Sequence, residues 1–163
     1  MACRTGCSHC CSARVEAFAP EIFRIAEELK TWPAQAREAV AVRMRDHVAA
    51  DAGTASWSDR PECPFLVDRR CSVYAVRPSA CRKAHSLAVE ACAANAPRIP
   101  QSLKLVVGTA ALTQGTLGAY AEAGFDASQH EMVSAVLTAL DDPTAEARWC
   151  AGEPVFGPRG TAV

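Results

Sequence analysis

The 163-residue chain lacks the features that mark several common classes of protein. The N-terminus has no basic segment followed by an apolar run, the pattern that indicates a secretory signal. The longest apolar stretch, LKLVVGTAAL, falls well short of the ~20 residues that a membrane-spanning helix needs. The formal net charge is only −1, so we expect neither nucleic acid nor a membrane surface as a partner. The sequence therefore predicts a cytoplasmic protein.

Patterns that signal catalysis are missing as well. The sequence shows no Gly-rich phosphate loop, no Ser-His-Asp arrangement and no pair of carboxylates placed for acid–base chemistry. It has no internal repeats and no low-complexity segments, and its length suits one domain with its own core. Whether the protein is an enzyme stays open at this point.

Cysteine, by contrast, is abundant, with nine in the chain. The number is odd and cytoplasmic thiols are kept reduced, so disulfides are a poor explanation. The spacing Cys7-x-x-Cys10 is that of a metal knuckle. The adjacent Cys10 and Cys11 side chains are expected to point in different directions, which suggests two ions or a multi-atom cluster. We interpret the isolated Cys150 as an inert buried side chain. The other eight fall in two blocks: Cys3, Cys7, Cys10 and Cys11, then Cys63, Cys71, Cys81 and Cys92.

Hydrophobic periodicity predicts a mainly α fold, a small helical domain with irregular cysteine-rich loops around a metal site. Helices are predicted over 20–30, 33–51 and 100–122, and a fourth begins at a capping box formed by Asp126 and Gln129. Gly53 and Gly124 should end the second and third helices, Asp142-Pro143 should start a further short turn, and CSVYAV suggests a short strand. The expected inward positions are Ile22, Ile25, Ala26 and Leu29, then Ala36, Val40, Met44 and Val48, then Leu103, Val106, Val107 and Ala110, and last Val133, Val136, Leu137 and Leu140.

These elements suggest three regions. Residues 1–100 form a cysteine-cluster, metal-binding region, and the helices of residues 100–150 pack on it as part of one domain. Residues 151–163 form a Gly/Pro-rich tail.

The motifs CSHCC, CPFL and CSVYAVRPSACR, followed by Cys92, closely resemble the YkgJ-like cysteine-cluster family, bacterial proteins assigned a zinc- or iron-chelating role. The chain departs from that pattern at two places, since Cys3 lies one residue further from Cys7 and Ser8 replaces a glycine. The resemblance covers about the first hundred residues. It implies that the eight clustered cysteines are the metal ligands, with Arg77 and Arg82 inside the motif as candidate cofactor-binding residues. Tyr74, which is also in the motif, is expected to pack over the site.

The identity of the metal stays open between two alternatives. Eight thiolates can make two closed zinc sites, or four can hold an iron–sulfur cluster. We favour the cluster, because adjacent cysteines suit several irons better than one zinc and because a proline after a ligand cysteine, as in Cys63-Pro64, recurs in ferredoxin-type loops. The predicted function is metal binding for redox chemistry, for electron transfer or as an accessory to a modifying enzyme. The alternatives are a zinc-stapled scaffold for a protein partner and a metal-dependent enzyme acting on a peptide or small molecule.

Overall fold

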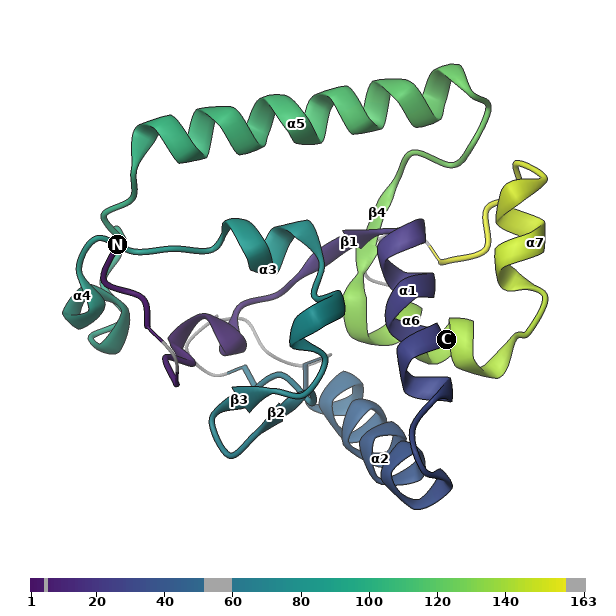
Figure 1. The fold of residues 1–163 in the computed structure, drawn as a ribbon, viewed down its shortest axis with the longest axis horizontal. Coiled ribbons are helices and arrows are strands. Elements are labelled where there is room, and N and C mark those ends of the chain that lie inside the picture. The colour runs from purple at the N-terminus through teal and green to yellow at the C-terminus, as the bar shows by residue number, and fades with distance from the viewer. Residues whose placement is uncertain (5, 52–59, 158–163) are drawn as a thin grey trace.

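The computed structural model describes residues 1–4, 6–51 and 60–157. The fold is mainly α, as the sequence predicts, and Figure 1 shows the arrangement of its elements. In chain order the elements are the 3-10 helix η1 (His9–Ser12), β1 (Glu16–Phe18), α1 (Ala19–Lys30), α2 (Ala34–Asp51), β2 (Leu66–Val67), β3 (Arg70–Cys71), the 3-10 helix η3 (Tyr74–Val76), α3 (Ser79–Lys83), α4 (Val89–Ala93), α5 (Leu103–Glu122), β4 (Gln129–Glu131), α6 (Met132–Asp141) and α7 (Ala145–Cys150).

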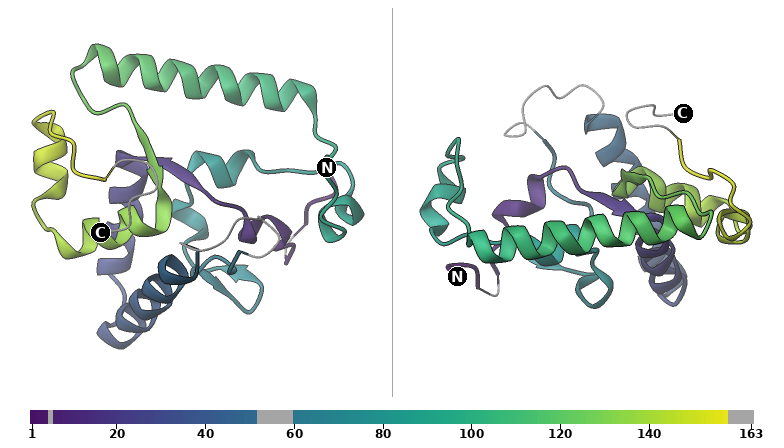
Figure 2. Two further views of the ribbon diagram at one scale, coloured as in Figure 1. Left: turned by 180° about the vertical axis from the view of Figure 1, so that it is seen from behind. Right: turned by 90° about the horizontal axis from the view of Figure 1, so that it is seen from above.

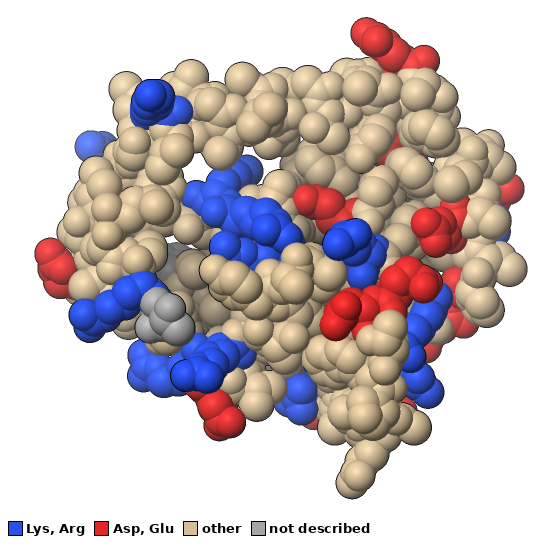
Figure 3. Space-filling view, viewed as in Figure 1, with Lys and Arg blue, Asp and Glu red and all other residues tan. Residues whose placement is uncertain are grey.

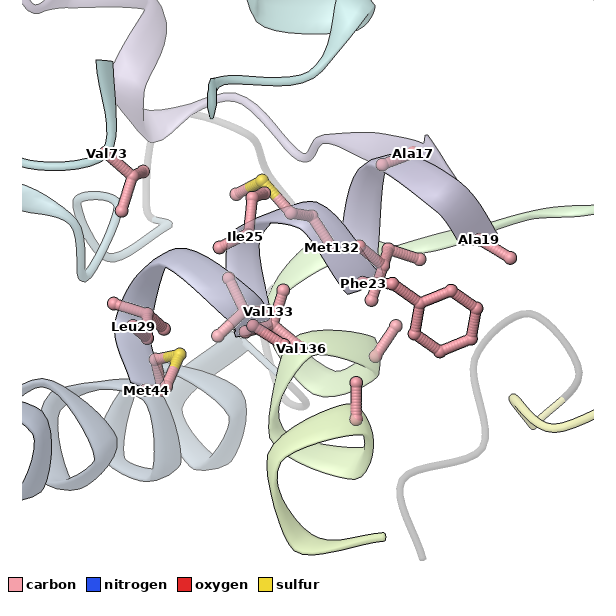
Figure 4. Close-up of a cluster of buried hydrophobic side chains, with 14 of the residues drawn as sticks. Ala17, Ala19, Phe23, Ile25, Leu29, Met44, Val73, Met132, Val133 and Val136 are labelled. Carbon is pink, nitrogen blue, oxygen red and sulfur yellow. The ribbon is translucent and has the colours of Figure 1, made fainter. Parts of the chain in front are cut away.

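The core forms where α6 packs against both α1 and α2 (Figure 4). The predicted face of α1 is confirmed, because Ile22, Ile25, Ala26 and Leu29 are all buried. The prediction for α2 holds in part: Val40 and Met44 are fully buried, whereas Ala36 is exposed. The contribution of α6 comes from Met132, Val133 and Val136, which pack against α1.

The first turn of α1 is fixed by Glu21. Its carboxylate accepts a hydrogen bond from the Phe18 amide at 3.1 Å, and this satisfies a donor at the helix start. The same carboxylate accepts a second hydrogen bond from the Ser79 amide at 2.6 Å. Because Ser79 begins α3, one carboxylate ties a core helix to the cysteine-bearing segment.

The predicted start of the fourth helix is wrong. Gln129 lies in β4, which pairs with β1 in antiparallel register, Ala17 opposite His130. Asp126 accepts a hydrogen bond from the Ser128 amide at 2.9 Å and so closes a local turn before the strand. Helix α6 begins only at Met132, where the Glu131 carboxylate accepts from the amides of Val133 and Ser134.

The inward face predicted for the third helix is also wrong. The helix itself exists as α5 and ends before Gly124, whose φ of +79° suits glycine. None of the described α5 residues is buried, and Leu103 is 76% exposed. Figures 1 and 2 show α5 running along one edge of the molecule, so one of its sides faces outward.

The second cysteine block folds as a hairpin followed by short helices. Strands β2 and β3 pair through a tight turn in which Asp68 and Arg69 adopt positive φ. The strand expected over CSVYAV extends only to Cys71, because the chain then turns into η3. Tyr74, at the start of η3, is 60% exposed, and its packing over the site stays a prediction.

The C-terminal segment closes the core with aromatic side chains. Helix α7, expected after Asp142-Pro143, carries Trp149, which stacks on Phe125 with 4.7 Å between ring centroids. The ring centroids of Phe156 and Phe23 lie 5.4 Å apart, so part of the predicted tail packs on α1. Cys150 is exposed, which corrects its predicted burial.

Two predictions lie wholly or partly outside the described residues. These are Gly53 as the end of the second helix and the tail beyond residue 157. Among the described helices, none combines the length and the apolar character that crossing a membrane requires.

Candidate metal centre

The predicted cysteine ligands gather around one cavity. The cavity measures about 1500 Å³ and is lined by thiols from both sequence blocks. Cys92 lies instead at a smaller cavity of about 300 Å³, together with His9. The lining cysteines are Cys3, Cys7, Cys10, Cys11, Cys63, Cys71 and Cys81.

Backbone pairing brings the two blocks together. The Cys63 amide donates a hydrogen bond to the Cys11 carbonyl at 2.7 Å, which joins the segment before β2 to the end of η1. The β2–β3 register then places Cys71 opposite Leu66, and α3 supplies Cys81. Four separate backbone segments therefore present Cys10 and Cys11, Cys63, Cys71 and Cys81.

The adjacent thiols Cys10 and Cys11 interact directly. The Cys11 thiol donates a hydrogen bond to the Cys10 thiolate, which lowers the pKa of Cys10 to about 6. The same hydrogen bond, together with burial, raises the pKa of Cys11 far above the ordinary range of a thiol. One thiolate is therefore already charged near neutral pH, while its neighbour keeps its proton.

Burial is the main cause of the shifts at the other three thiols. It raises the pKa of Cys63 to about 11 and that of Cys81 to about 12, and it raises the pKa of Cys71 as well. Backbone amides oppose this effect at two positions, since the amide of Phe65 donates to the Cys63 sulfur and that of Val73 to the Cys71 sulfur. Because metal ligands must be deprotonated, a bound cation would displace these protons.

Arg77 is the cationic side chain most closely associated with the thiols. Its charge lowers the pKa of Cys10, Cys71 and Cys81. Its guanidinium carbon lies 4.0 Å from the centroid of the Tyr74 ring, a cation–π contact that orients the group. Its Nε atom is buried without a hydrogen-bond partner among the described residues, which leaves a donor available to sulfur.

Arg82 acts on the backbone instead. Its guanidinium donates to the Arg77 and Ala75 carbonyls, each at 2.8 Å. It thereby holds the turn that carries Arg77, while its side chain also lines the cavity. As a cofactor-binding residue, Arg82 stays a prediction.

The cavity as a whole is basic, with eight Arg and Lys residues against three acidic ones in its lining. Figure 3 shows Lys and Arg gathered in the hollow below α5. Arg4, Arg14 and Arg60 were not among the candidates from the sequence, because no local motif marks them. Arg14 and Arg60 are both placed by Asp51 at the end of α2, at 3.8 and 3.5 Å.

Cys3 and His85 form hydrogen bonds with backbone groups. The Cys3 sulfur accepts a hydrogen bond from the Ser86 amide at 3.3 Å. Both ring nitrogens of His85 are engaged: Nδ1 donates to the Lys83 carbonyl at 2.8 Å, and Nε2 accepts from the Ser102 amide at 2.9 Å. His85 is therefore occupied as a structural residue that joins α3 to the start of α5.

A known family pattern covers all eight clustered cysteines. The CxxCxxCC family, assigned as a zinc- or iron-chelating domain, matches residues 2–99, more than half of the chain. The chain belongs to this family. No curated protein and no solved structure shows significant similarity to it. The match confirms the resemblance identified from the sequence and, with it, metal binding in general. Helices α5, α6 and α7 lie beyond the CxxCxxCC domain.

The donor set of the CxxCxxCC domain fits zinc or iron chemically. Thiolate ligands favour zinc and iron–sulfur clusters over hard cations such as magnesium, and the basic lining can balance their charge. Within the described residues, no three Cys, His, Asp or Glu side chains lie close enough together to hold a single ion. The thiols therefore surround the cavity rather than converge on one point, and the individual ligand assignments stay predictions.

Proposed function

We propose that the CxxCxxCC domain holds an iron–sulfur cluster and uses it in redox chemistry, in electron transfer or as an accessory to a modifying enzyme. One observation carries the proposal: seven cysteines line a single cavity without converging on one ion position. A cluster spreads its ligands over several irons, whereas a structural zinc needs four donors about 2.3 Å from one point.

The five thiols nearest to the β2–β3 hairpin are the first candidates for this role. Cys10, Cys11, Cys63, Cys71 and Cys81 influence one another's pKa values, so their sulfurs share one electrostatic environment. Cys3, Cys7 and Cys92 complete the predicted set. When bound, the cluster would supply one-electron chemistry.

The charges of the cavity suit a bound metal centre of either kind. Four thiolates around an oxidised cubane or around one zinc ion leave a net charge of about −2, which a basic lining stabilises. The buried Arg77 Nε has no hydrogen-bond partner among the described residues, and hydrogen bonds to sulfur are among the factors that set a cluster's potential.

Anaerobic purification followed by metal analysis tests the proposal. The protein should be brown, contain iron and sulfide, and absorb broadly near roughly 400 nm, and this absorption should bleach on reduction. Cys81→Ser should lower the iron content. Cys150→Ser is the matched control, because Cys150 is exposed on α7, outside the cavity. A colourless protein without iron would refute the cluster.

A zinc-stapled scaffold for a protein partner is the second candidate. The amides of Phe65 and Val73 each donate to the sulfur of the cysteine two positions earlier, an arrangement that also suits a zinc knuckle. Zinc has no accessible redox change, so this protein would be colourless and stable in air, with about two ions per chain for two four-thiolate sites.

A further inference from the structure

The outward side of α5 carries a regular stripe of residues outside the CxxCxxCC domain. A helix turns by about 100° per residue, so positions spaced alternately by four and three residues lie within about 40° of a common direction. Six residues of α5 follow this spacing, and all six are exposed. They are Lys104, Gly108, Ala111, Gly115, Gly118 and Glu122, which we call the α5 stripe.

The opposite side of α5 faces the rest of the protein. Thr109 and Leu105 line the large cavity. Tyr120 packs edge-on against Phe18 and Trp149. These contacts fix the rotation of the helix about its axis, so the α5 stripe points away from the molecule. Figure 2 shows this side of α5 without neighbouring elements among the described residues.

No contact among the described residues requires glycine at the stripe's three glycine positions. A Cβ atom added at Gly108, Gly115 or Gly118 would meet no other atom within 4 Å. Each glycine inside a helix nevertheless destabilises it by roughly 0.5–1 kcal/mol relative to alanine. Small residues along one side of a helix allow another helix to approach closely, near the lower end of the usual 8–10 Å between axes.

The order of residues in the stripe identifies the other helix. The stripe is symmetric about Thr113: an antiparallel copy of α5 centred there places Ala111 against Gly115 and Gly108 against Gly118. It also places Lys104 of each copy against Glu122 of the other, and these are the only charged residues of α5. Neither has an ion-pair partner among the described residues. A two-fold interface requires this self-complementarity.

We propose that two copies of this chain associate through an antiparallel pairing of their α5 stripes. The pairing joins each Lys104 to a Glu122 across the interface and covers the apolar side chains that flank the stripe. Among these, Val107 and Leu112 are 59% and 74% exposed in the single chain. Two metal-binding cavities would then lie on opposite sides of one helix pair.

The mass of the purified full-length protein, measured by sedimentation over a range of concentrations, tests the pairing. We expect a species of about twice 17.3 kDa. Ala111→Glu should abolish it, because the new carboxylate lies inside the close helix contact. Ala110→Glu is the matched control, with the same change at an exposed neighbour about 100° away from Ala111. A monomeric wild-type protein, or equal masses for the two variants, would overturn the proposal.

A charge exchange tests the direction of the pairing. Lys104→Glu and Glu122→Lys should each raise the dimer Kd by roughly tenfold, because each replaces two attractive contacts by two repulsive ones. The double variant should restore the wild-type Kd. A parallel pair would place Lys104 against Lys104. The Kd of the double variant would then equal the value expected from adding the effects of the two single changes, with no recovery. Circular dichroism of every variant checks that the helix content is unchanged.

Discussion

The unequal thiol pKa values predict a strongly selective chemical modification of the metal-free protein. Iodoacetamide reacts with thiolates, and its reaction at each cysteine can be followed by mass spectrometry as a function of pH. The reactivity of Cys10 should rise with a midpoint near pH 6 and approach a plateau above about pH 7, because the Cys11 thiol stabilises the Cys10 thiolate. The reactivity of Cys81 should still rise above pH 9, because burial raises its pKa to about 12.

The expected difference in rate at pH 7 follows from these values. Cys10 is about 90% thiolate, whereas about one Cys81 side chain in 10⁵ is ionised. A thiolate of lower pKa is also a weaker nucleophile, and a Brønsted slope of about 0.45 over six pKa units removes roughly 500-fold of that advantage. Cys10 should therefore react about two hundred times faster than Cys81.

A substitution isolates the cause of this selectivity. Cys11→Ala removes the donor to the Cys10 thiolate, so the midpoint of the Cys10 profile should move up toward the ordinary thiol value of 9.0. Cys150→Ala, at an exposed cysteine on α7, is the control and should leave the midpoint unchanged. The reasoning fails if Cys81 reacts as fast as Cys10 at pH 7, or if Cys11→Ala leaves the Cys10 midpoint in place.

Two further predictions concern the core. Trp149→Ala should lower the free energy of unfolding in urea by about 3–5 kcal/mol, because Trp149 is 6% exposed and stacks on Phe125; a loss as small as that of the exposed control Leu112→Ala would contradict this packing. Burial raises the pKa of Asp126, but hydrogen bonds from Ser128 and the neighbouring His130 outweigh it, and the pKa lies below the ordinary 3.8. The contribution of Asp126 to stability is then complete above about pH 4 and is lost as pH falls through the lowered pKa. Asp126→Asn should abolish this loss of stability at low pH. If the variant and the wild type show the same dependence of stability on pH, Asp126 does not make this contribution.

The sequence predicts those elements whose signals are local. Helix α1 was predicted with its buried face, because apolar residues at helical spacing and Pro20 at its start lie within one segment. The start of α6 was missed because β4 pairs with β1, more than a hundred residues earlier, and that pairing outweighs a local capping pattern. The buried face assigned to α5 was wrong because apolar character alone does not show whether a helix packs on its own chain.

The candidate site shows the same division. The cysteine motif includes all seven thiols that line the cavity, and it also contains Arg77. The association of Cys92 with a different cavity depends on α4, whose position no local pattern indicates. Tyr74 is 60% exposed, and its ring contacts the Arg77 guanidinium and lines the same cavity as the thiols.

The site and the core depend on different sources of stability. Within the described residues 60–99, only Phe65, Val73 and Val76 are buried hydrophobic side chains, whereas α1 and α6 together bury more than ten. Those three side chains join the core of α1 and α6, and polar contacts add to them, such as the Ser79 amide on Glu21 and the Cys63 amide on the Cys11 carbonyl. Metal binding to thiolates contributes directly to folding energy. We therefore expect metal binding at the predicted ligands Cys63, Cys71, Cys81 and Cys92 to stabilise residues 60–99, which bury few apolar side chains of their own.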